Sequence, residues 1–561
     1  MKLTGAQVLI QCLKEQGVDT IFGFPGGAVL PIYDALFDSD LVHILTAHEQ
    51  GATHGADGYA RATGKVGVVF ATSGPGATNT VTGIATAYMD SVPMVVFTGQ
   101  VPLALLGKDS FQEVDITGIT LPITKHNYIV KDAQALPGII REAFDIARRG
   151  RPGPVLVDIP KDIQTTIIDY QPQVIDTNYR DSCSLGKLGE DIQKLEDNLK
   201  AAADIIKASE RPVVFSGGGV IISNAHRELI EFAVKLKAPV ATSLMGLGAF
   251  PADHPLYLGM VGMHGTKYGN YAVSNCDLII AVGVRFSDRV ISNVARFAPS
   301  AKIIHIDIDP AELGKNIEVH IPLNGDVKAI LSRLIDMTEE KRANGWNKRV
   351  EEWKRRYPLK YRDDGSLKPQ YILSKLYQLA RDKSIITTEV GQHQIWAAQY
   401  FNYSQPRTFI SSGGLGTMGY GLGAAIGAQL GCPHKRVINI AGDGSFKMNA
   451  NELATVARYR LPIIEVVMNN NALGMVRQWQ QLFFKGRFSN TTLGGDLDFV
   501  KLAQAYGIKG LRLDDKAKVE SVLKEALDYN GPVLIDCIID QDEKVFPIVP
   551  PGAPIVDVID E

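Results

Sequence analysis

Two polar residues that follow neighbouring hydrophobic runs could bind a divalent cation. A strand-like run, 437–441, leads to Asp443, and a second one, 462–468, leads to Asn470. A helical segment separates them, so the two strands should be parallel and both residues should emerge at the carboxyl edge of one sheet, where α/β proteins bind ligands. One carboxylate and one amide oxygen suit Mg²⁺, which keeps water and takes further ligands from phosphate.

Two glycines, Gly442 and Gly444, flank the aspartate. They let the backbone approach an anion closely and point N–H groups at it. Taken alone, a Gly-Asp-Gly sequence is more often a tight strand-to-helix turn with an incidental aspartate. The Asn-Asn pair that begins after 24 intervening residues favours a combined cation and phosphate site.

Further motifs follow one another along nearly the whole chain. They are PGG at 25–27, HEQGA at 48–52, SGPGATN at 73–79, FQE at 111–113, PKD at 160–162, GMHG at 262–265, RFSDR at 285–289, GQHQ at 391–394, GLGTMG at 414–419 and NNNALGMVRQW at 469–479. With the GDG and NN pair, this series resembles the catalytic large subunits of acetohydroxyacid synthase (acetolactate synthase), a family of thiamine-diphosphate-dependent enzymes.

The expected fold class is α/β, with three consecutive doubly wound parallel-sheet domains. A chain of 561 residues is too long for one hydrophobic core, and Val/Ile/Phe-rich runs alternate with helical patterns. The resemblance implies a pyrimidine-binding domain with the catalytic Glu at 1–165. It implies an FAD-binding domain at 191–335 and a domain that binds the diphosphate and Mg²⁺ at 369–540. The connecting parts are a linker at 166–190, a charged connector at 336–368 and a proline-rich tail, a candidate lid, at 541–561. A Gly/Ala-rich helix, 419–431, should allow close helix packing.

The resemblance implies one reaction and three cofactors. Pyruvate would be decarboxylated on thiamine diphosphate, and the hydroxyethyl (acetaldehyde) unit would be transferred to a second pyruvate or to 2-oxobutyrate. This is the first common step of valine, leucine and isoleucine biosynthesis. The expected cofactors are thiamine diphosphate, Mg²⁺ and FAD.

The resemblance assigns Glu49, Gln112 and Met418 to catalysis. Glu49 would hydrogen-bond N1′ of the cofactor aminopyrimidine and so favour the tautomer that removes the C2 proton. Met418 would support the bent cofactor, and Gln112 would line the substrate channel. Taken alone, Glu49 would be interpreted as a surface residue, but the HEQGA motif together with PGG favours a catalytic role for it. Taken alone, Met418 would be interpreted as a residue that packs in the hydrophobic core.

The remaining site residues follow from the same resemblance. Those for thiamine diphosphate are Pro25, Gly26, Gly27, Ser73, Asn79, Val390, Gly391, Gln392, His393, Gly416, Met418, Gly442, Gly444 and Ser445. Those for FAD are Gly217, Gly218, Met263, His264, Gly265, Gly283, Arg285, Asp307 and Asp326. The substrate would meet Phe111, Lys161, Arg289, Met475 and Trp479, and the metal would meet Asp443, Asn470 and the carbonyl of Ala472.

Two of these assignments compete with simpler interpretations, and one neighbouring residue departs from the family pattern. Arg289 would clamp a substrate carboxylate through two hydrogen bonds, although an isolated arginine is more often a surface charge. Trp479 lies one helical turn beyond Met475, so it could equally belong to a hydrophobic stripe in the core. Ser287 departs from the family pattern, which is more often RFDDR.

Composition excludes several other classes of protein. A net charge of −3 and a pI near 6.4 provide no basic patch for nucleic acid. No apolar run reaches the ~20 residues of a membrane span. The cysteines lack CxxC spacing, which indicates neither a zinc site nor a disulfide framework; they are Cys12, Cys183, Cys276, Cys432 and Cys537. The N-terminus resembles no leader peptide, so a bacterial-type cytoplasmic chain is expected.

Two other functions remain open. A pyruvate oxidase that uses FAD and thiamine diphosphate shares the architecture, but RFSDR and GMVRQW argue against it. A catalytically silent scaffold subunit is disfavoured by the intact Glu49, Asp443 and Asn470. Glyoxylate carboligase is also disfavoured, because it lacks the glutamate that this chain has at position 49. The resemblance further implies a homodimer or a dimer of dimers with active sites at the subunit interface, and a small regulatory subunit.

Overall fold

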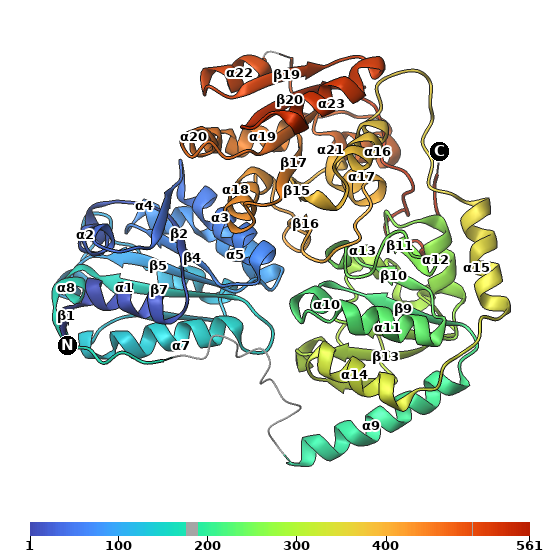
Figure 1. Ribbon diagram of the computed structural model, residues 1–561, viewed down its shortest axis with the longest axis horizontal. Helices are drawn as coiled ribbons and strands as arrows, with labels where there is room; N and C mark the ends of the chain where they lie inside the picture. The colour runs from blue at the N-terminus through green and yellow to red at the C-terminus, as the bar shows by residue number, and fades with distance from the viewer. Residues whose placement is uncertain (175–188, 496, 561) are drawn as a thin grey trace.

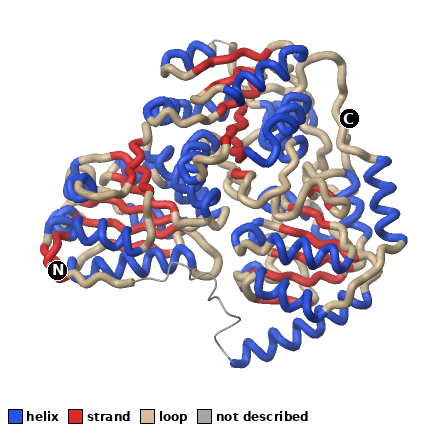
Figure 2. The backbone as a smooth tube through the Cα atoms, in the orientation of Figure 1, coloured by secondary structure: helices blue, strands red, loops and turns tan. Residues whose placement is uncertain are grey.

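The computed structural model describes residues 1–174, 189–495 and 497–560. Within them the chain forms three six-stranded sheets and one two-stranded sheet. All pairings in the three large sheets are parallel, and helices flank each sheet (Figures 1 and 2). The predicted α/β class with three doubly wound parallel sheets is confirmed.

The first sheet has the strand order β3-β2-β4-β5-β7-β6. Its strands are β2 Thr20–Phe24, β3 Val42–Leu45, β4 Gly67–Ala71, β5 Met94–Gln100, β6 His126–Ile129 and β7 Pro154–Pro160. Its helices are α1 Gly5–Glu15, α2 Leu30–Phe37, α3 Glu49–Thr63, α4 Pro75–Asn79, α5 Val81–Met89, α6 Ile116–Thr120, α7 Leu136–Arg148 and α8 Lys161–Thr165. Each face of the sheet carries its own hydrophobic core, which is why the central strands read as uninterrupted apolar runs.

The third sheet repeats this topology. Its order, β16-β15-β17-β18-β20-β19, matches that of the first sheet strand for strand, so the first and third domains share one topology. The strands are β15 Ser384–Thr388, β16 Phe409–Ile410, β17 Arg436–Gly442, β18 Ile464–Asn469, β19 Lys509–Leu513 and β20 Val533–Ile538. The helices are α16 Pro369–Ala380, α17 Gln392–Tyr400, α18 Gly421–Gly431, α19 Asp443–Asn449, α20 Leu453–Arg458, α21 Gly474–Phe483, α22 Phe499–Ala505 and α23 Val519–Asp528.

The middle sheet differs in topology, with the order β11-β10-β9-β12-β13-β14. This is the dinucleotide-binding order, in which ligands bind where the order reverses, here between β9 and β12. Its strands are β9 Pro212–Ser216, β10 Val240–Thr242, β11 Tyr257–Met260, β12 Leu278–Val282, β13 Lys302–Asp307 and β14 Ile321–Asn324. Its helices are α9 Gly189–Ala208, α10 Gly218–Ile222, α11 His226–Leu236, α12 Lys267–Asn275, α13 Asp288–Ile291 and α14 Val327–Met337.

The connecting segments contain regular secondary structure. A short strand, β8 Ile167–Asp169, pairs antiparallel with β1 Lys2–Thr4 inside the expected linker, whereas linker residues 175–188 lie outside the described part of the chain. The charged connector contains α15 Gly345–Arg356, which is not wholly solvated because it buries Trp346. The indole of Trp346 donates a hydrogen bond to the carbonyl of Pro212 at 3.2 Å.

The proline-rich tail packs against both the third and the middle domains. Val545, Ile548 and Ile555 are almost fully buried, and the backbone N–H of Val549 donates to the carbonyl of Met263 at 2.8 Å. None of the helices in residues 1–174, 189–495 and 497–560 combines the length and the apolar character that a membrane span requires.

Helices α3 and α18 join the first and third domains through glycines, and they lie side by side (Figure 1). A Cβ at Gly427 would lie 1.8 Å from the carbonyl oxygen of Gly55. A Cβ at Gly58 would lie 2.1 Å from the carbonyl oxygen of Ala424. The backbones therefore approach so closely that no side chain fits between them, as the Gly/Ala-rich composition of α18 predicts.

Replacing Gly427 by alanine should separate these helices. Overpacking costs about 1–3 kcal/mol, and each kcal/mol lowers the melting midpoint of a domain of 150–250 residues by about 2–4 °C. The matched control is Gly138→Ala in α7, where an added Cβ meets no atom within 4 Å. Differential scanning calorimetry should show a lower midpoint for Gly427→Ala only; equal midpoints for the two variants would contradict the close packing.

Candidate active site

The carboxyl edge of the third sheet carries a buried carboxylate whose oxygens accept no hydrogen bond from the described residues. Asp443 begins α19 and is 1% exposed, and neither of its carboxylate oxygens receives a hydrogen bond from the described part of the chain. Burial raises the pKa of this carboxyl to about 6. Since a buried carboxylate without a partner is strongly unfavourable, Asp443 fits the role of a ligand to a bound cation.

Asn470 lies beside it because β17 and β18 pair in parallel, with Gly442 opposite Met468. This confirms that both predicted residues emerge at one sheet edge. The Asn470 side-chain oxygen accepts a hydrogen bond from the Ala472 N–H at 3.1 Å. Among the described residues no group of three His, Cys, Asp or Glu could hold a metal. One carboxylate, one amide and one backbone carbonyl form a hard-oxygen set that suits Mg²⁺.

The N-terminus of α17 joins the same edge. The Gln392 side-chain oxygen lies 3.4 Å from the Asn470 amide nitrogen. His393 is buried, its Nε2 has no partner among the described residues, and burial lowers the pKa of its imidazole to about 3. A Cβ at Gly442 would lie 2.7 Å from His393 Nδ1. The neutral His393 and the Gln392 amide therefore pack against the GDG turn. Backbone N–H groups in such a turn can donate hydrogen bonds to a phosphate.

Smaller residues complete this region. Gly391, which precedes α17, and Gly416 have positive φ angles of 151° and 74°. A Cβ at Gly444 would lie 2.7 Å from the Leu473 side chain. The Ser445 hydroxyl donates a hydrogen bond to the carbonyl of Gly442 at 3.2 Å, within the same turn.

A second cluster forms at the corresponding edge of the first sheet. Glu49 is the first residue of α3 and is 8% exposed, and it accepts a hydrogen bond from the Asn79 side-chain amide at 3.0 Å. A Cβ at Gly76 would lie 3.1 Å from the Glu49 carboxylate and 2.7 Å from Thr72, and a Cβ at Gly26 would lie 2.6 Å from Thr72. The HEQGA, SGPGATN and PGG motifs therefore meet. Pro25, Gly27 and Ser73 lie within those motifs, and no side chain occupies the space a Cβ at Gly27 would take.

Two of the three residues predicted to line the substrate channel from the first domain face solvent in the single chain, and the third, Gln112, is partly buried. Phe111 is 88% exposed and Lys161 is exposed at the start of α8. The backbone at Gln112 has φ 58° and lies 2.9 Å from the position of a Cβ at Gly74. None of the three lines the large cavity described next.

A cavity of about 1060 Å³ lies between the middle and third domains and reaches α5 of the first. Its lining includes most of the residues assigned to FAD, namely Gly218, Met263, His264, Gly283, Arg285, Asp307 and Asp326. It also includes Val390, Gly391, Gly416, Arg289, Met475 and Trp479. Gly217 and Gly265 pack behind this wall, since a Cβ at Gly217 would lie 2.2 Å from the carbonyl oxygen of Gly283. The cavity therefore connects the reversal point of the middle sheet with the third domain.

Two acidic residues on the wall have different environments. Burial raises the pKa of Asp307, at the end of β13, to about 6. Asp326 instead caps α14, where it accepts hydrogen bonds from the Lys328 N–H at 3.0 Å and from the Ser223 hydroxyl at 2.7 Å. Arg285 donates to the carbonyl of Met89 at 2.8 Å and so fastens the cavity wall to the first domain.

Arg289 and Trp479 face each other across this cavity. The guanidinium carbon lies 5.6 Å from the centre of the indole ring, within cation–π range, and one guanidinium nitrogen lies 3.7 Å from the sulfur of Met263. The nearest carboxylate to Arg289 is Asp288, at 3.8 Å. The Arg289 side chain is 60% exposed, so it can receive a carboxylate ligand, and Trp479 lines a cavity instead of a closed core.

Sequence reasoning missed Asp158, which orients the Gln100 side chain that bonds the backbone at Val114, two residues beyond Gln112. The Gln100 side-chain amide donates to both the Val114 carbonyl and the Asp158 carboxylate, at 2.8 and 2.9 Å. Burial raises the pKa of Asp158 to about 7. The available signal was an acidic residue inside the apolar strand Pro154–Pro160.

Comparisons with known proteins agree with this geometry. The thiamine pyrophosphate enzyme family matches through its N-terminal TPP binding domain at residues 3–119, its central domain at 199–334 and its C-terminal TPP binding domain at 389–537. The chain is 50% identical to a probable acetolactate synthase large subunit of Methanocaldococcus jannaschii, over 99% of this chain and 95% of the relative. It is 47% identical to the acetolactate synthase isozyme 2 large subunit of Escherichia coli strain K12, over 98% of both chains.

A third relative, the acetolactate synthase large subunit of Parasynechococcus marenigrum strain WH8102, is 49% identical over 98% of this chain and 90% of the relative. The chain belongs to the thiamine pyrophosphate enzymes and, within them, to the acetolactate synthase large subunits.

The raised pKa of Asp158 predicts a specific pH dependence. In the folded chain this carboxyl keeps its proton up to about pH 7, whereas the unfolded chain loses it near pH 4. Stability should therefore fall as pH rises from about 4 to 7, by at most about 1.4 kcal/mol per pH unit, and level off above that.

The measurement compares melting midpoints of the wild type and Asp158→Asn between pH 4.5 and 8. The stability of the wild type relative to the variant should decrease across this range. Asp204→Asn, on the exposed side of α9, corrects for the loss of one negative charge. Parallel curves for the wild type and Asp158→Asn would show that the carboxyl ionises normally in the folded chain.

Proposed function

We propose that this chain is the catalytic subunit of an acetolactate synthase that joins pyruvate to a second pyruvate or to 2-oxobutyrate. The observation that carries the proposal is the buried Asp443 carboxylate, which has no partner among the described residues and lies beside Asn470 at a sheet edge. A cation held on a diphosphate would neutralise it. The names of the relatives, acetolactate synthase large subunits at 47–50% identity, support the choice of reaction.

Thiamine diphosphate, when bound, supplies a nucleophilic carbon and an electron sink for decarboxylation. In this proposal Asp443, Asn470 and the Ala472 carbonyl hold Mg²⁺ on the diphosphate, with the third domain, 369–540, as the diphosphate-binding unit. The phosphate cradle is the GDG turn with Ser445, Gln392 and His393.

The first domain, 1–165, takes the aminopyrimidine. Glu49 hydrogen-bonds the ring nitrogen N1′ and holds or releases the proton there. Its contact with Asn79, 3.0 Å away, fixes the carboxylate direction, and the neighbouring glycines leave room for a ring. Met418 contacts the cofactor from the third domain, and its unbranched side chain can adapt to a bent ligand.

The middle domain, 191–335, would bind FAD in the large cavity. The close approach of the loops after β9 and β12, at the point of sheet reversal, fits a nucleotide. Asp307 could accept a hydrogen bond from a ribose hydroxyl. Arg289 clamps the carboxylate of the acceptor, and Trp479 with Met475 surrounds its alkyl end.

We further propose that two copies complete each active site. Phe111 is 88% exposed and Lys161 faces solvent, so both are available to a neighbouring subunit. A homodimer or a dimer of dimers would bring them to the cavity. The relatives are called large subunits, which supports a separate small regulatory partner. The described cysteines are free, which agrees with a reducing cytoplasm.

One assay separates the candidate functions. Pyruvate is supplied with and without thiamine diphosphate, Mg²⁺ and FAD, and both acetolactate and consumed oxygen are measured. We expect acetolactate that depends on thiamine diphosphate and Mg²⁺. Oxygen consumption that accounts for all pyruvate used would instead indicate a pyruvate oxidase, and no turnover would indicate a catalytically silent scaffold subunit.

The metal assignment predicts the behaviour of Asp443→Ala. This change removes the only charged oxygen ligand of the proposed site, so Mg²⁺-dependent binding of thiamine diphosphate should be lost, whereas FAD should still bind. Isothermal titration measures both affinities. Met448→Ala, at an exposed position of the same helix, is the control. Normal thiamine diphosphate affinity in Asp443→Ala would contradict the assignment.

The position of Trp479 predicts acceptor selectivity. Pocket contact with one methylene is worth roughly 1–3 kcal/mol, or about 10–200-fold, so Trp479→Leu should lose most of any preference for 2-oxobutyrate over pyruvate. The products of a competition between both acceptors measure it. Phe483→Leu, whose ring centre lies 6.1 Å from that of Trp479 outside the cavity lining, should keep the wild-type product ratio. An unchanged ratio in folded Trp479→Leu would place Trp479 outside the acceptor pocket.

A further inference from the structure

The turn that leads into Glu49 is held by a residue of the third domain. Glu452 ends the short helix η10 Ala450–Glu452 and is fully buried. Its carboxylate accepts hydrogen bonds from the backbone N–H groups of Ala47 and His48, at 3.2 and 3.0 Å, and from the Thr455 hydroxyl at 2.6 Å. A carboxylate more than 400 positions away in sequence thus fixes the backbone immediately before Glu49.

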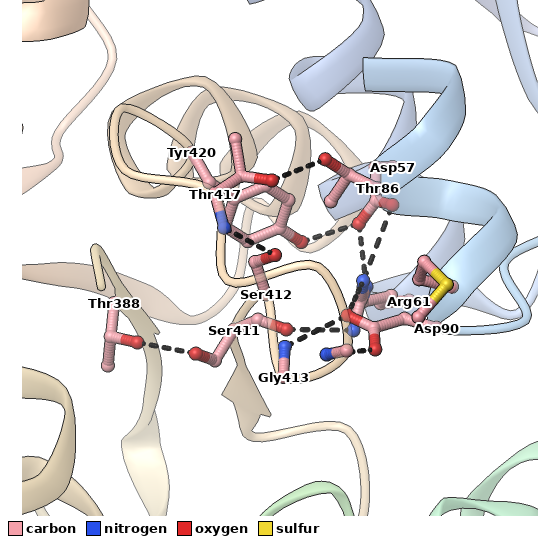
Figure 3. A network of polar contacts seen from close by, with 12 residues as sticks. Asp57, Arg61, Thr86, Asp90, Thr388, Ser411, Ser412, Gly413, Thr417 and Tyr420 are labelled. Atoms are coloured by element: carbon pink, nitrogen blue, oxygen red, sulfur yellow. Dashed lines mark hydrogen bonds and ion pairs between the residues drawn. The ribbon is translucent and has the colours of Figure 1, made fainter. Parts of the chain in front are cut away.

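The loop that carries Met418 is held, in turn, by the first domain. This loop, 411–420, precedes α18, and Asp90 at the end of α5 accepts hydrogen bonds from the N–H groups of Gly413 and Gly414, at 3.0 and 2.7 Å. Figure 3 shows the contact between Asp90 and Gly413 together with those of Arg61. Both oxygens of one carboxylate are therefore used to fix two successive residues of the loop.

Arg61 connects this carboxylate to helix α3. The guanidinium lies between Asp57 and Asp90, with nitrogen–oxygen distances of 2.6 and 3.0 Å, and it donates to the carbonyl of Ser411 at 3.0 Å (Figure 3). The side chains of both aspartates are fully buried. The carboxylates of Asp57 and Asp90 thus share the guanidinium of Arg61. Their other hydrogen-bond donors include backbone N–H groups of the loop 411–420.

Two hydroxyl contacts fasten the rest of the loop. The Thr86 hydroxyl, on α5, lies 2.7 Å from that of Thr417, directly before Met418. The Tyr420 hydroxyl, after Met418, donates to Asp57. Contacts from the first domain therefore hold the chain on both sides of Met418 (Figure 3).

We propose that the α3–α18 interface is a reciprocal clamp, in which Glu452 positions Glu49 and the Asp90–Arg61 pair positions Met418. The proposal rests on the roles of Glu49 and Met418 in the proposed function. Glu452, Asp90 and Arg61 are positioning residues in it. A buried ion pair adds little net stability because desolvation offsets the attraction, so fixing the geometry of two catalytic segments gives these buried charges a function.

The first domain offers a comparable ion pair that touches neither segment. Arg141 of α7 and Glu15 of α1 are 2.9 Å apart, and their side chains are 16% and 8% exposed. Glu15→Gln and Arg141→Lys are therefore matched controls for Glu452→Gln and Arg61→Lys. Glutamine offers one acceptor oxygen to the three donors at Glu452. Lysine cannot bridge Asp57, Asp90 and the Ser411 carbonyl as a planar guanidinium does.

The experiment measures hydrogen–deuterium exchange at C2 of bound thiamine diphosphate, with saturating Mg²⁺ and cofactor, alongside cofactor affinity and the melting midpoint. Displacement of a catalytic group by about 1 Å can slow a reaction roughly 100-fold. We expect exchange to slow about 10- to 100-fold in Glu452→Gln, Asp90→Asn and Arg61→Lys, with cofactor affinity within about threefold of the wild type. The two controls should exchange at the wild-type rate.

A double variant tests whether Glu452 acts through Glu49. If so, Glu49→Gln combined with Glu452→Gln should exchange no more slowly than Glu49→Gln alone, because the positioned group is already gone. Multiplied effects, or wild-type exchange in folded Glu452→Gln, would overturn the clamp. If a charged-residue variant fails to fold, Thr86→Val serves in its place, because it removes one hydroxyl contact beside Met418. Exchange at C2 should still be slower in Thr86→Val than in the wild type. Wild-type exchange in Thr86→Val would overturn the Met418 half of the clamp. Absence of C2 exchange in the wild type would instead reject the proposed function.

Discussion

The close packing of α3 against α18 is the constraint on which the rest of the molecule depends. Gly55 and Gly427 allow the two helix backbones to approach until an added Cβ would lie 1.8 Å from a carbonyl oxygen. This contact joins the first and third domains, which share one strand order. Glu49 begins one of these helices, and the loop with Met418 leads into the other. The distance between the helices therefore sets the relative position of Glu49 and of the loop with Met418.

Burial of charge distinguishes the two sheet edges. Asp443 is buried without a partner in the described chain, and the pKa of its carboxyl is raised to about 6, so this edge favours a cation. Glu49 is buried with the Asn79 amide beside it, so that edge presents an oriented hydrogen-bonding group. Two copies of one topology thus provide different chemistry, because the polar residues at the two sheet edges differ and follow non-equivalent strands, β17 before Asp443 and β3 before Glu49, whereas the strand order is the same.

The middle domain adds a wall to the site. Its sheet reverses between β9 and β12, and the cavity that begins there extends to Trp479 and Arg289. Arg285 links this wall to the first domain through the Met89 carbonyl, and the tail binds Met263 through Val549. Segments from all parts of the chain therefore converge on one cavity.

The sequence by itself determined the local chemistry. The positions of Asp443 and Asn470 followed from strand–helix–strand order, because parallel strands end at one edge, and the glycines of α18 predicted close packing. Only the tertiary structure decided which distant groups hold these segments: Glu452 beside Ala47, Asp90 beside Gly413, and Arg289 over Trp479. Contacts between domains have no periodicity along the chain, since their partners lie far apart in sequence, so no spacing in the sequence could reveal them.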